Sequence, residues 1–363
     1  MKEIEQNQII FFLPDPKVGG VEKNFFLISE YLSKYFNNLC LITAKGLNKK
    51  LNKKIYIIEI SKFWHKINRR FFFLICSIKL FFQCLNSKNS IIFSFQGNFY
   101  AILVAIILKK KIIVRSNLSP LGWKSSRFKI IIFKFLLSKA DIIVVNSYDF
   151  KKQVKKIFNV NSEVIYNPLN LLQIHKDASY KKKITFYKKK TINLITVGRL
   201  VDQKNQIEII KAIKRLGDFV TNYRLLIIGS GPKREELKKF IILNSLQKYI
   251  KIIFSKKATK YINMADVFIL SSKYEGLPNV LLEAACLNKY IISSNCKTGP
   301  SEILKQYQYG ELYDQGNIKQ LSYKLNRLQK KKFYNKKRSV HKLKLFDFND
   351  NLKKYLRLIE KLN

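Results

Sequence analysis

Short runs of Ile, Val, Leu and Phe alternate with longer, helix-patterned segments along most of the chain. Continuous apolar runs of this kind are typical of strands buried on both faces, and the intervening segments are long enough for crossover helices. The expected strands cover residues 9–13, 38–43, 55–60, 91–95, 111–116, 141–147, 163–167, 192–198, 223–231, 250–254, 265–272 and 290–294. The pattern predicts an α/β protein with two Rossmann-like, doubly wound parallel sheets in succession.

A Lys-rich segment interrupts this alternation at residues 176–190, KDASYKKKITFYKKK. It has no hydrophobic periodicity, which is typical of a linker or an exposed loop. We therefore expect an N-terminal domain over 1–175 and a C-terminal domain over 191–339. The helical segment 340–363 is a candidate to pack back on the N-terminal domain. Ligands of such sheets bind at the carboxyl ends of the strands, which predicts a cleft between the two domains.

Two apolar stretches raise the question of a membrane. Residues 89–108 carry no charge and are long enough to span one, but Ser94 and the polar residues 96–98 lie in the middle. A strand, a polar loop and a helix therefore explain this stretch better. Residues 71–85 are too short to span and contain Lys79, so they predict either a core helix or an amphipathic helix facing a membrane.

The charge of the chain is strongly positive, with 69 Lys and Arg against 24 Asp and Glu, a net charge of +45. Lys, Asn, Ile, Phe and Tyr are all frequent, as an AT-rich coding bias would produce, and the lysines are spread along the chain. A nucleic-acid-binding protein would instead concentrate basic residues with stacking aromatics on one face. The composition therefore favours coding bias as the main cause of the high positive charge. Attraction to an anionic membrane surface is a consequence, and no nucleic-acid partner is expected.

Cysteine and histidine usage bears on metal sites and cell compartment. The chain has an odd number of cysteines and no C-x-x-C pair, which argues against a disulfide framework or a zinc site and is typical of a reducing cytoplasm. These are Cys40, Cys76, Cys84, Cys286 and Cys296. The three histidines are far apart, so no metal centre is expected. The first residues, MKEIEQNQIIFFLP, lack the order of a signal peptide, which favours a cytoplasmic location.

Two glycine-rich turns follow expected strands. Gly19 and Gly20 separate the first strand from the first helix, and Gly229 and Gly231 follow the strand that begins at residue 223. Glycine lets backbone N–H groups approach an anion at a helix N-terminus. A phosphate site and a plain tight turn both explain these glycines.

Two cations stand in the loop after the expected strand 192–198, in VGRLVDQKNQ. Arg199 and Lys204 precede a helix there. Cations beside a helix N-terminus form a phosphate site, although two solvated cations are also possible in a Lys-rich chain.

The segment EGLPNVLLE places two acids in an apolar stretch. Glu275 would stand at a strand end and Glu283 between one and two turns into the following helix, with Pro278 at its first position. The turn and the helix start, whose free N–H groups would point between the acids, are formed by Gly276, Leu277, Pro278, Asn279 and Val280. This arrangement suits a nucleoside diphosphate sugar. The alternative, a helix-start acid at 275 and a surface acid at 283, is weakened by the apolar neighbours of Glu283.

These motifs, in the order GGVE, GRLVDQK, GSGP, ADVFILSSKYEGLPNVLLEA and TGPSEIL, resemble the retaining glycosyltransferases of family 4, which have the GT-B fold. The chain is most similar to the branch that builds bacterial surface polysaccharides and lipid-linked oligosaccharides. The resemblance covers nearly the whole chain and is most specific over residues 192–312. It implies a hexosyltransferase that needs no metal or other cofactor besides its donor, a nucleotide sugar, here expected to be UDP-linked.

The resemblance also implies roles for individual residues. Gly20 would approach the donor diphosphate, and Arg199 and Lys204 would neutralise it and stabilise the leaving group. Glu275 would contact the sugar hydroxyls and Glu283 the ribose hydroxyls. The acceptor would be lipid-linked or a surface polysaccharide, and the enzyme would lie on the inner face of the cytoplasmic membrane. No carboxylate nucleophile is evident in the N-terminal half, so front-face displacement is the expected mechanism.

The sequence departs from the family pattern in two places. Many members carry a His in the loop that here reads Gln96, Gly97 and Asn98, which makes Asn98 the candidate substitute at the catalytic centre. Ser255 replaces a glycine, which leaves nucleobase recognition open. Residues 114–123 resemble a cleft-facing segment. Two alternative functions remain, a sugar-nucleotide epimerase and a non-catalytic binding protein of the same fold, and donor hydrolysis would separate them from a transferase.

Overall fold

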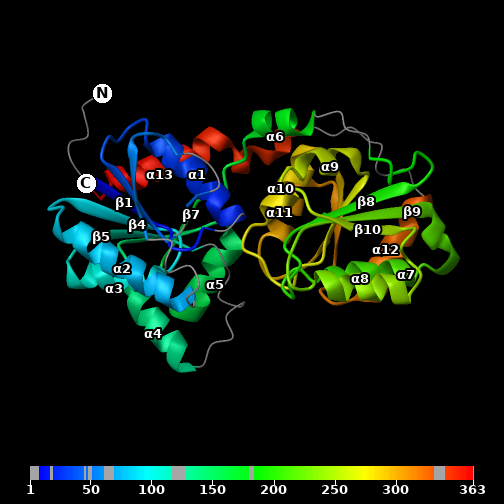
Figure 1. Ribbon diagram of the computed structural model, residues 1–363, viewed down its shortest axis with the longest axis horizontal. Helices are drawn as coiled ribbons and strands as arrows, with labels where there is room; N and C mark the ends of the chain where they lie inside the picture. Colours follow the sequence, from blue (N-terminus) through cyan, green and yellow to red (C-terminus); the bar gives the residue numbers. More distant parts are fainter. Residues whose placement is uncertain are drawn as a thin grey trace. The chain divides into compact units, whose positions relative to one another are not determined.

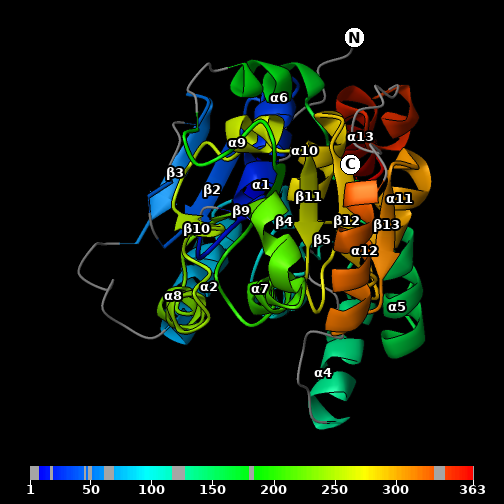
Figure 2. The same cartoon turned by 90° about the vertical axis from the view of Figure 1, so that its right-hand side faces the viewer.

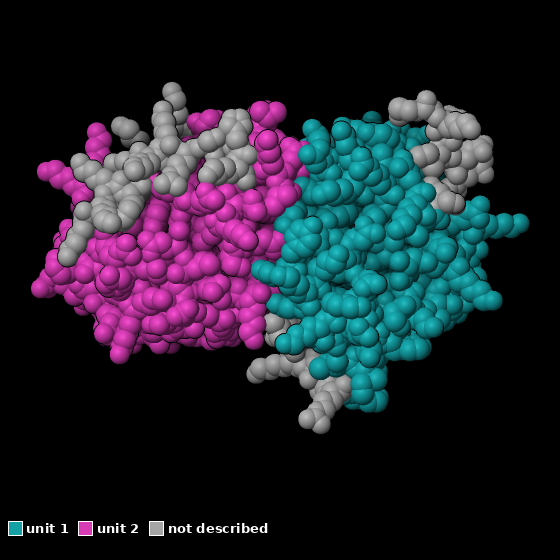
Figure 3. Space-filling model, turned by 180° about the vertical axis from the view of Figure 1, so that it is seen from behind, with its two compact units in different colours: residues 1–168, 348–363 teal, residues 169–347 magenta. Residues whose placement is uncertain are grey.

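The computed structural model describes residues 8–16, 19–44, 46–47, 51–60, 69–116, 127–179, 184–330 and 340–362. The chain divides into two compact units (Figure 3). Unit 1 comprises residues 1–168 and 348–363, and unit 2 comprises residues 169–347. Each unit has its own parallel sheet, so the expected architecture of two α/β halves is confirmed.

The sheet of unit 1 has seven parallel strands in the order β3-β2-β1-β4-β5-β6-β7. They are β1 Gln8–Phe12, β2 Leu39–Thr43, β3 Ile55–Glu59, β4 Ser90–Ser94, β5 Lys111–Arg115, β6 Ile142–Val145 and β7 Glu163–Val164. The central strand β1 pairs with β2 on one side, Ile10 opposite Cys40, and with β4 on the other, Ile10 opposite Ile92. All five residues of β2 and of β4 are buried, as strands covered on both faces require.

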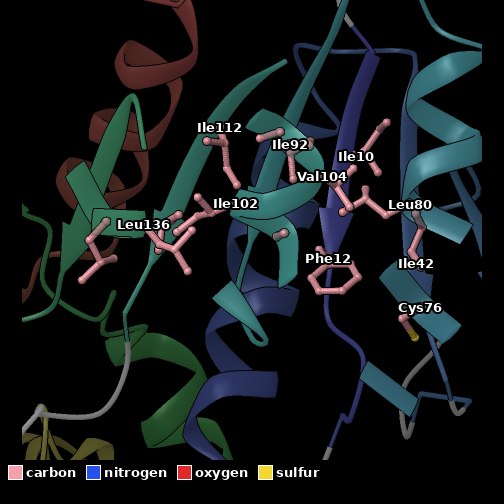
Figure 4. Packing of buried hydrophobic residues seen from close by; sticks show 14 of the residues in the cluster. Ile10, Phe12, Ile42, Cys76, Leu80, Ile92, Ile102, Val104, Ile112 and Leu136 are labelled. Atoms are coloured by element: carbon pink, nitrogen blue, oxygen red, sulfur yellow. The ribbon is translucent and has the colours of Figure 1, made fainter. Parts of the chain in front are cut away.

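Helices cover both faces of this sheet (Figure 1). One layer contains α2 Arg69–Leu85, α3 Asn98–Ile107, α4 Arg127–Ser138 and α5 Tyr148–Phe158, and the other contains α1 Gly20–Leu32 and α13 Phe348–Glu360. Alternate strand residues fill the two interfaces. Ile10 and Phe12 pack with Leu80 on the α2 side (Figure 4), whereas Phe11 packs with Phe25 and Tyr355 on the α1 and α13 side.

Unit 2 repeats the plan with six parallel strands in the order β10-β9-β8-β11-β12-β13. The strands are β8 Ile192–Val197, β9 Tyr223–Ile228, β10 Ile250–Ile253, β11 Val267–Leu270, β12 Tyr290–Ser294 and β13 Gly310–Tyr313. Three helices line one face, namely α7 Gln206–Lys214, α8 Arg234–Leu243 and α12 Ile318–Lys330. The other layer, visible in Figure 2, contains α6 Leu171–Ala178, α9 Thr259–Met264, α10 Asn279–Cys286 and α11 Pro300–Tyr307. Two 3-10 segments, η3 Gly217–Asn222 and η5 Val340–Phe346, complete the elements.

All twelve expected strands occur, and one strand was missed. β13 has the sequence GELY, which has too few apolar residues to stand out as a strand. Its glycine has a packing reason, because a Cβ at Gly310 would lie 2.4 Å from the carbonyl oxygen of Ile291 on the neighbouring strand. β13 is identified as a strand only in the folded structure, where it pairs with β12 at the edge of the sheet.

The division between the units falls after Pro168, seven residues before the expected boundary. Helix α6 belongs to unit 2 because it packs against α9 and α10, and the Leu169 amide donates to the carbonyl of Phe346 at 2.9 Å. The C-terminal segment is also divided. Residues 340–347 belong to unit 2, and residues 348–363 return to unit 1, where α13 packs on α1.

Arg115 ties this returning helix to the sheet of unit 1. The side chain is buried at the end of β5. Its Nε donates to the Tyr355 hydroxyl at 2.8 Å, and its Nη2 donates to Asn167 Oδ1 at 2.7 Å. One guanidinium thereby links β5, the segment that leaves unit 1 and the helix that comes back to it.

The two apolar stretches fold without spanning a membrane. Residues 89–108 form β4, a polar loop and α3, as expected, and residues 71–85 form most of α2. No helix in the described part of the chain is long and apolar enough to cross a bilayer. All five cysteines are buried thiols.

Candidate functional site

The middle of the unit 2 sheet contains a topological switch point. β8 and β11 are neighbours, but the chain continues from β8 to β9 on one side and from β11 to β12 on the other. The loops after β8 and β11 lie at the carboxyl ends of these strands, which is where doubly wound sheets bind ligands. Six of the residues singled out in the sequence belong to these two loops, namely Arg199, Lys204, Glu275, Gly276, Leu277 and Pro278.

Lys204 and Glu275 are in contact at this switch point. They are 71 positions apart in sequence, and their Nζ and Oε1 atoms are 2.5 Å apart. Their side chains are only 14% and 8% exposed. The Ser272 hydroxyl donates to the same carboxylate oxygen at 2.6 Å, which fixes its orientation. A largely buried ion pair at a switch point provides both a cation and a carboxylate to a ligand.

Hydrogen bonds to backbone carbonyl groups hold the two loops together around this pair. The Gln203 side chain donates to the carbonyl of Tyr274 at 2.9 Å, and the Lys273 amide donates to the carbonyl of Gln203 at 2.8 Å. The Ser271 hydroxyl donates to the carbonyl of Lys204 at 2.9 Å. These bonds position Lys204 and Glu275 before any ligand arrives, which lowers the cost of organising the site.

The loop after β12 closes the site on the third side. The Thr298 hydroxyl donates to the carbonyl oxygen of Glu275. Gly299 has a φ of +86°, and a Cβ there would lie 2.3 Å from the carbonyl oxygen of Gly276. Sequence reasoning noticed TGPSEIL as a motif but assigned no role to Thr298, because its partner becomes visible only when the two loops are in contact.

Cys296 lies in the same loop. Burial, followed by the nearby Glu275 carboxylate, raises the pKa of the Cys296 thiol to about 12. The thiol is therefore protonated at neutral pH and is not a nucleophile. The thiol instead contacts the carbonyl oxygen of Thr298 in the same loop, at 3.9 Å.

Arg199 is the exposed cation of the site. Its Nη2 donates to Gln203 Oε1 at 3.4 Å, a long hydrogen bond, and its backbone carbonyl accepts from the Gln206 side chain at 3.0 Å. The backbone of Arg199 is thus fixed, whereas its guanidinium is accessible to an anion.

The glycines after β9 bring two loops into backbone contact. A Cβ on Gly229 would lie 1.9 Å from the carbonyl oxygen of Gly198, and one on Gly231 would lie 2.4 Å from that of Leu200. The Leu200 amide also donates to the carbonyl of Ser230 at 2.9 Å. Packing alone therefore requires both glycines, and it places Arg199 between two fixed neighbours. A contact of Gly229 and Gly231 with the ligand stays a prediction.

Helix α10 presents its N-terminus next to Glu275. The helix begins at Asn279, so the expectation that Pro278 is its first residue was wrong by one position. Pro278 is the residue before the helix and has an extended ψ of 106°. Leu277 is buried, and the half-buried Asn279 and Val280 form the first turn. Glu283 is only 8% exposed, which argues against the surface-acid alternative.

The comparisons with known proteins concern this unit above all. Residues 177–342 match the family described as glycosyl transferases group 1. This segment is similar to a group 1 glycosyl transferase domain. This domain contains all the site residues of unit 2 discussed above, from Arg199 to Gly299.

Two relatives illustrate the extent of the similarity. An uncharacterized glycosyltransferase of Methanocaldococcus jannaschii is 32% identical over 185 residues, which span 49% of this chain and 46% of that relative. The chain therefore spans about half the length of this relative. The N-acetylgalactosamine-N,N'-diacetylbacillosaminyl-diphospho-undecaprenol 4-alpha-N-acetylgalactosaminyltransferase of Campylobacter jejuni is 26% identical over 82% of this chain and 84% of its own length. The domain and these names support the expected enzyme class.

A solved structure confirms the fold over the whole chain. The crystal structure of Anabaena HepE in complex with UDP has a TM-score of 0.74 at 12% identity, and the similarity covers 98% of this chain and 100% of that one. The two-domain, parallel-sheet fold expected from the sequence is therefore confirmed.

The remaining predicted residues belong to unit 1, outside the glycosyl transferase domain. Helix α1 begins at Gly20, and Gly19 is extended with a φ of 171°, a conformation open to any residue. Asn98 is the first residue of α3. Its Oδ1 accepts from the Ser94 hydroxyl at 2.8 Å, and its Nδ2 donates to the carbonyl of Arg115 at 3.5 Å. Asn98 thus links β4, α3 and β5, and a catalytic role for it stays a prediction.

Two other expectations concern segments near the sites. Only residues 114–116 of the segment 114–123 lie within the described residues. Ser255 lies in the loop between β10 and α9, and its hydroxyl accepts from the Lys257 amide at 3.2 Å.

Among the described residues, no three His, Cys, Asp or Glu side chains are grouped to hold a metal ion.

Proposed function

We propose that the protein is a retaining hexosyltransferase. It moves a hexosyl or N-acetylhexosaminyl group from a UDP-linked sugar to a lipid-linked or surface-polysaccharide acceptor. The observation that carries this proposal is the Lys204–Glu275 pair at the switch point of a group 1 glycosyl transferase domain. A sugar nucleotide has an anionic diphosphate beside a neutral, hydroxyl-rich ring, and this pair offers one partner to each.

Each group of the donor has a candidate partner in unit 2. Arg199 and Lys204 would bind the diphosphate, together with the N-terminal amides of α10, and Glu275 would accept hydrogen bonds from the sugar hydroxyls. Glu283 would hold the ribose hydroxyls. Glu275 accepts a hydrogen bond from Lys204, whose side chain is only 14% exposed, and so holds this cation in place for the diphosphate. Gly20, at the first position of α1 in unit 1, is proposed to approach the same diphosphate.

The chemistry follows from charge development on the donor. The bond between C1 of the sugar and the β-phosphate oxygen breaks, and the acceptor oxygen bonds to C1 from the same face. The acceptor proton passes to the departing phosphate, so the products are the glycosylated acceptor and UDP. Negative charge grows on the phosphate as the bond breaks. Arg199 and Lys204 therefore interact more strongly with the phosphate in the transition state than in the ground state. Glu275 orients the sugar and is not the nucleophile.

The donor and the acceptor are inferred from the compared proteins. HepE was crystallised with UDP, which supports a UDP-linked donor. The name of the Campylobacter relative specifies a diphospho-undecaprenol-linked substrate and an N-acetylgalactosaminyl group, which supports a lipid-linked acceptor and an N-acetylated hexose. We further propose that the enzyme acts at the inner face of the cytoplasmic membrane and needs no metal.

A panel of nucleotide sugars tests the proposal. We expect one UDP-sugar to raise the melting temperature of the protein and to be hydrolysed slowly in the absence of acceptor. If no UDP-, GDP- or ADP-sugar does either, the proposal is wrong. Conversion of one UDP-sugar into another without release of UDP would instead identify an epimerase. Stabilisation without any turnover, with acceptor present, would identify a binding protein.

A further inference from the structure

The outer surface of the α2, α3 and α4 layer in unit 1 is apolar. Eleven of the 23 exposed large hydrophobic side chains in the described part of the chain lie on these three helices. We call them the apolar face, and they are Phe71, Leu74, Ile78, Phe82, Leu85, Leu103, Ile106, Ile107, Phe128, Ile131 and Phe135. Phe82 is 58% exposed and Phe128 is 71% exposed. Large exposed apolar patches mark interaction sites in soluble proteins.

These side chains form stripes on the solvent side of each helix. On α2 they follow one another three or four residues apart from Phe71 to Leu85, and on α4 from Phe128 to Phe135. The opposite side of α2 already fills the core, where Cys76 and Leu80 are buried under the sheet. The three helices are neighbours in one layer (Figure 1), so their outer stripes share one side of unit 1. The apolar face is therefore a second apolar surface and is not part of the core.

The same region of the chain contains no acidic residue. Between Glu59 and Asp141 there are fifteen Lys and Arg but neither Asp nor Glu, whereas an even distribution of the 24 acids would place about five there. A uniform coding bias raises the lysine content everywhere and does not by itself empty one segment of acids. Exposed lysines border the apolar face directly, among them Lys79 on α2 and Lys134 on α4. Apolar surface and unopposed positive charge therefore coincide.

We propose that the apolar face binds the surface of an anionic lipid bilayer. Its Phe, Ile and Leu side chains enter the boundary between headgroups and acyl chains, and the surrounding lysines reach the anionic headgroups. This pairing of an apolar stripe with basic flanks is how interfacial helices bind membranes. The proposal rests on the proposed function in one respect, since a lipid-linked acceptor would be met at that surface.

Charge favours a bilayer over another protein molecule as the occupant. A second copy docked on the same face would place its own acid-free, basic surface against this one, and like charges oppose such a contact. An anionic bilayer supplies the opposite charge and an apolar interior at once. Neutral lipid would leave the lysines without partners, so binding should depend on anionic headgroups.

Sedimentation with vesicles tests the proposal on the full-length protein. We expect the wild type to bind vesicles of phosphatidylcholine and phosphatidylglycerol, and to bind vesicles of phosphatidylcholine alone far less. The variant Ile78→Gln/Phe82→Gln/Ile131→Gln/Phe135→Gln should bind anionic vesicles roughly tenfold or more weakly, because four inserted side chains are lost. The variant Ile242→Gln/Leu243→Gln removes two exposed apolar side chains from α8 of unit 2 and should bind like the wild type.

Three results would overturn the proposal. The wild type could fail to bind anionic vesicles, or the fourfold variant could bind as tightly as the wild type. Alternatively, light scattering could show that the wild type is an oligomer that the fourfold variant dissolves, which would assign the face to a second copy. All four substitutions are at exposed positions, so an unchanged circular dichroism spectrum serves as the folding check. Stabilisation by the nucleotide sugar should survive in the variant, which separates a failure here from a failure of the proposed transferase.

Discussion

The two units share the order of six strands, to which unit 1 adds β7, but they differ in the chemistry at their switch points. In unit 1 the loops after β1 and β4 meet through a neutral contact, in which the Asp15 amide donates to Gln96 Oε1 at 3.0 Å. In unit 2 the equivalent loops, after β8 and β11, meet through the Lys204–Glu275 ion pair. The topology determines where a ligand can bind, and the loop side chains determine which ligand the place suits.

The outer helices of the two units also differ in charge and in exposed apolar surface. Helix α8 of unit 2 carries charges of both signs, and Glu235 and Glu236 form ion pairs with Lys238 and with Lys233, the residue before the helix. The α2, α3 and α4 layer of unit 1 has lysines, no acids and an exposed apolar stripe on each helix. The first surface is suited to water and the second to an anionic bilayer. In the two proposals above, unit 2 binds the donor and unit 1 binds the membrane, and four predictions test this division.

The largest effect should come from the ion pair of unit 2. Lys204→Met keeps much of the aliphatic chain but removes the cation that stabilises the leaving phosphate, so we expect the transfer rate to fall roughly a hundredfold or more. Steady-state kinetics with a saturating donor would show the loss mainly in kcat. Glu235→Gln breaks an exposed ion pair with Lys238 and serves as the control, with an unchanged rate. Equal rates for Lys204→Met and the wild type would remove Lys204 from the mechanism.

Loss of the buried guanidinium of Arg115 should lower the stability of unit 1. Arg115→Met leaves the Tyr355 hydroxyl and Asn167 Oδ1 without their donor, which costs roughly 2–4 kcal/mol of unfolding free energy. Lys111→Met, on the same strand but exposed, should cost little. Urea unfolding measures both. If the division of labour is correct, Arg115→Met still binds the nucleotide sugar under conditions where it remains folded.

Adding a methyl group at Gly229 should destabilise unit 2 and leave unit 1 unchanged. Gly229→Ala would place a Cβ against the carbonyl oxygen of Gly198, so the loops after β8 and β9 must separate, at a cost of about 2–3 kcal/mol. Gly198→Ala is the matched control, because its Cβ would meet the Lys204 side chain at an ordinary 3.5 Å. Donor binding should weaken for Gly229→Ala while vesicle binding stays the same. A loss of vesicle binding in this variant would contradict the assignment of that function to unit 1.

The smallest effect concerns pH. Burial lowers the pKa of Lys289, beside β12, to about 8, and the Asp266 carboxylate opposes this shift only in part. Between pH 8 and the ordinary lysine value of 10.5 the unfolded chain therefore holds a proton that the folded chain has released. The free energy of unfolding should rise with pH across that window, by on the order of 1 kcal/mol. Lys289→Met should lose this rise, and parallel pH profiles of the two proteins would contradict it.

The sequence predicted the fold well because its strands are apolar on both faces. A run such as IIFFL can only be buried, whereas GELY gives no such signal and was missed. Domain limits were less predictable, since the position of α6 depends on which helices it packs against. The segment 71–85 left a choice between core and membrane, and the structure explains why. Helix α2 is apolar on nearly every side, so sequence alone could not separate the buried side from the exposed one.

For the site, the sequence identified the charged residues but not the groups that hold them. Arg199, Lys204 and Glu275 stand out because each follows an expected strand. The supporting contacts of Gln203 and Thr298 do not, because their partners are backbone atoms of other loops. Such partners are set by how closely the loops approach, and that distance depends on glycines such as Gly299.

The central claim, that the Lys204–Glu275 pair divides the donor between phosphate and sugar, can be tested directly by calorimetric titration. UDP and the UDP-sugar that stabilises the protein most would each be titrated into the wild type, Lys204→Met and Glu275→Gln. We predict that Lys204→Met weakens both ligands. Glu275→Gln should weaken the UDP-sugar but bind UDP at least as tightly as the wild type, because Lys204 is then released to the phosphate. Equal weakening of UDP and the UDP-sugar by Glu275→Gln, or no weakening of either, would contradict the account.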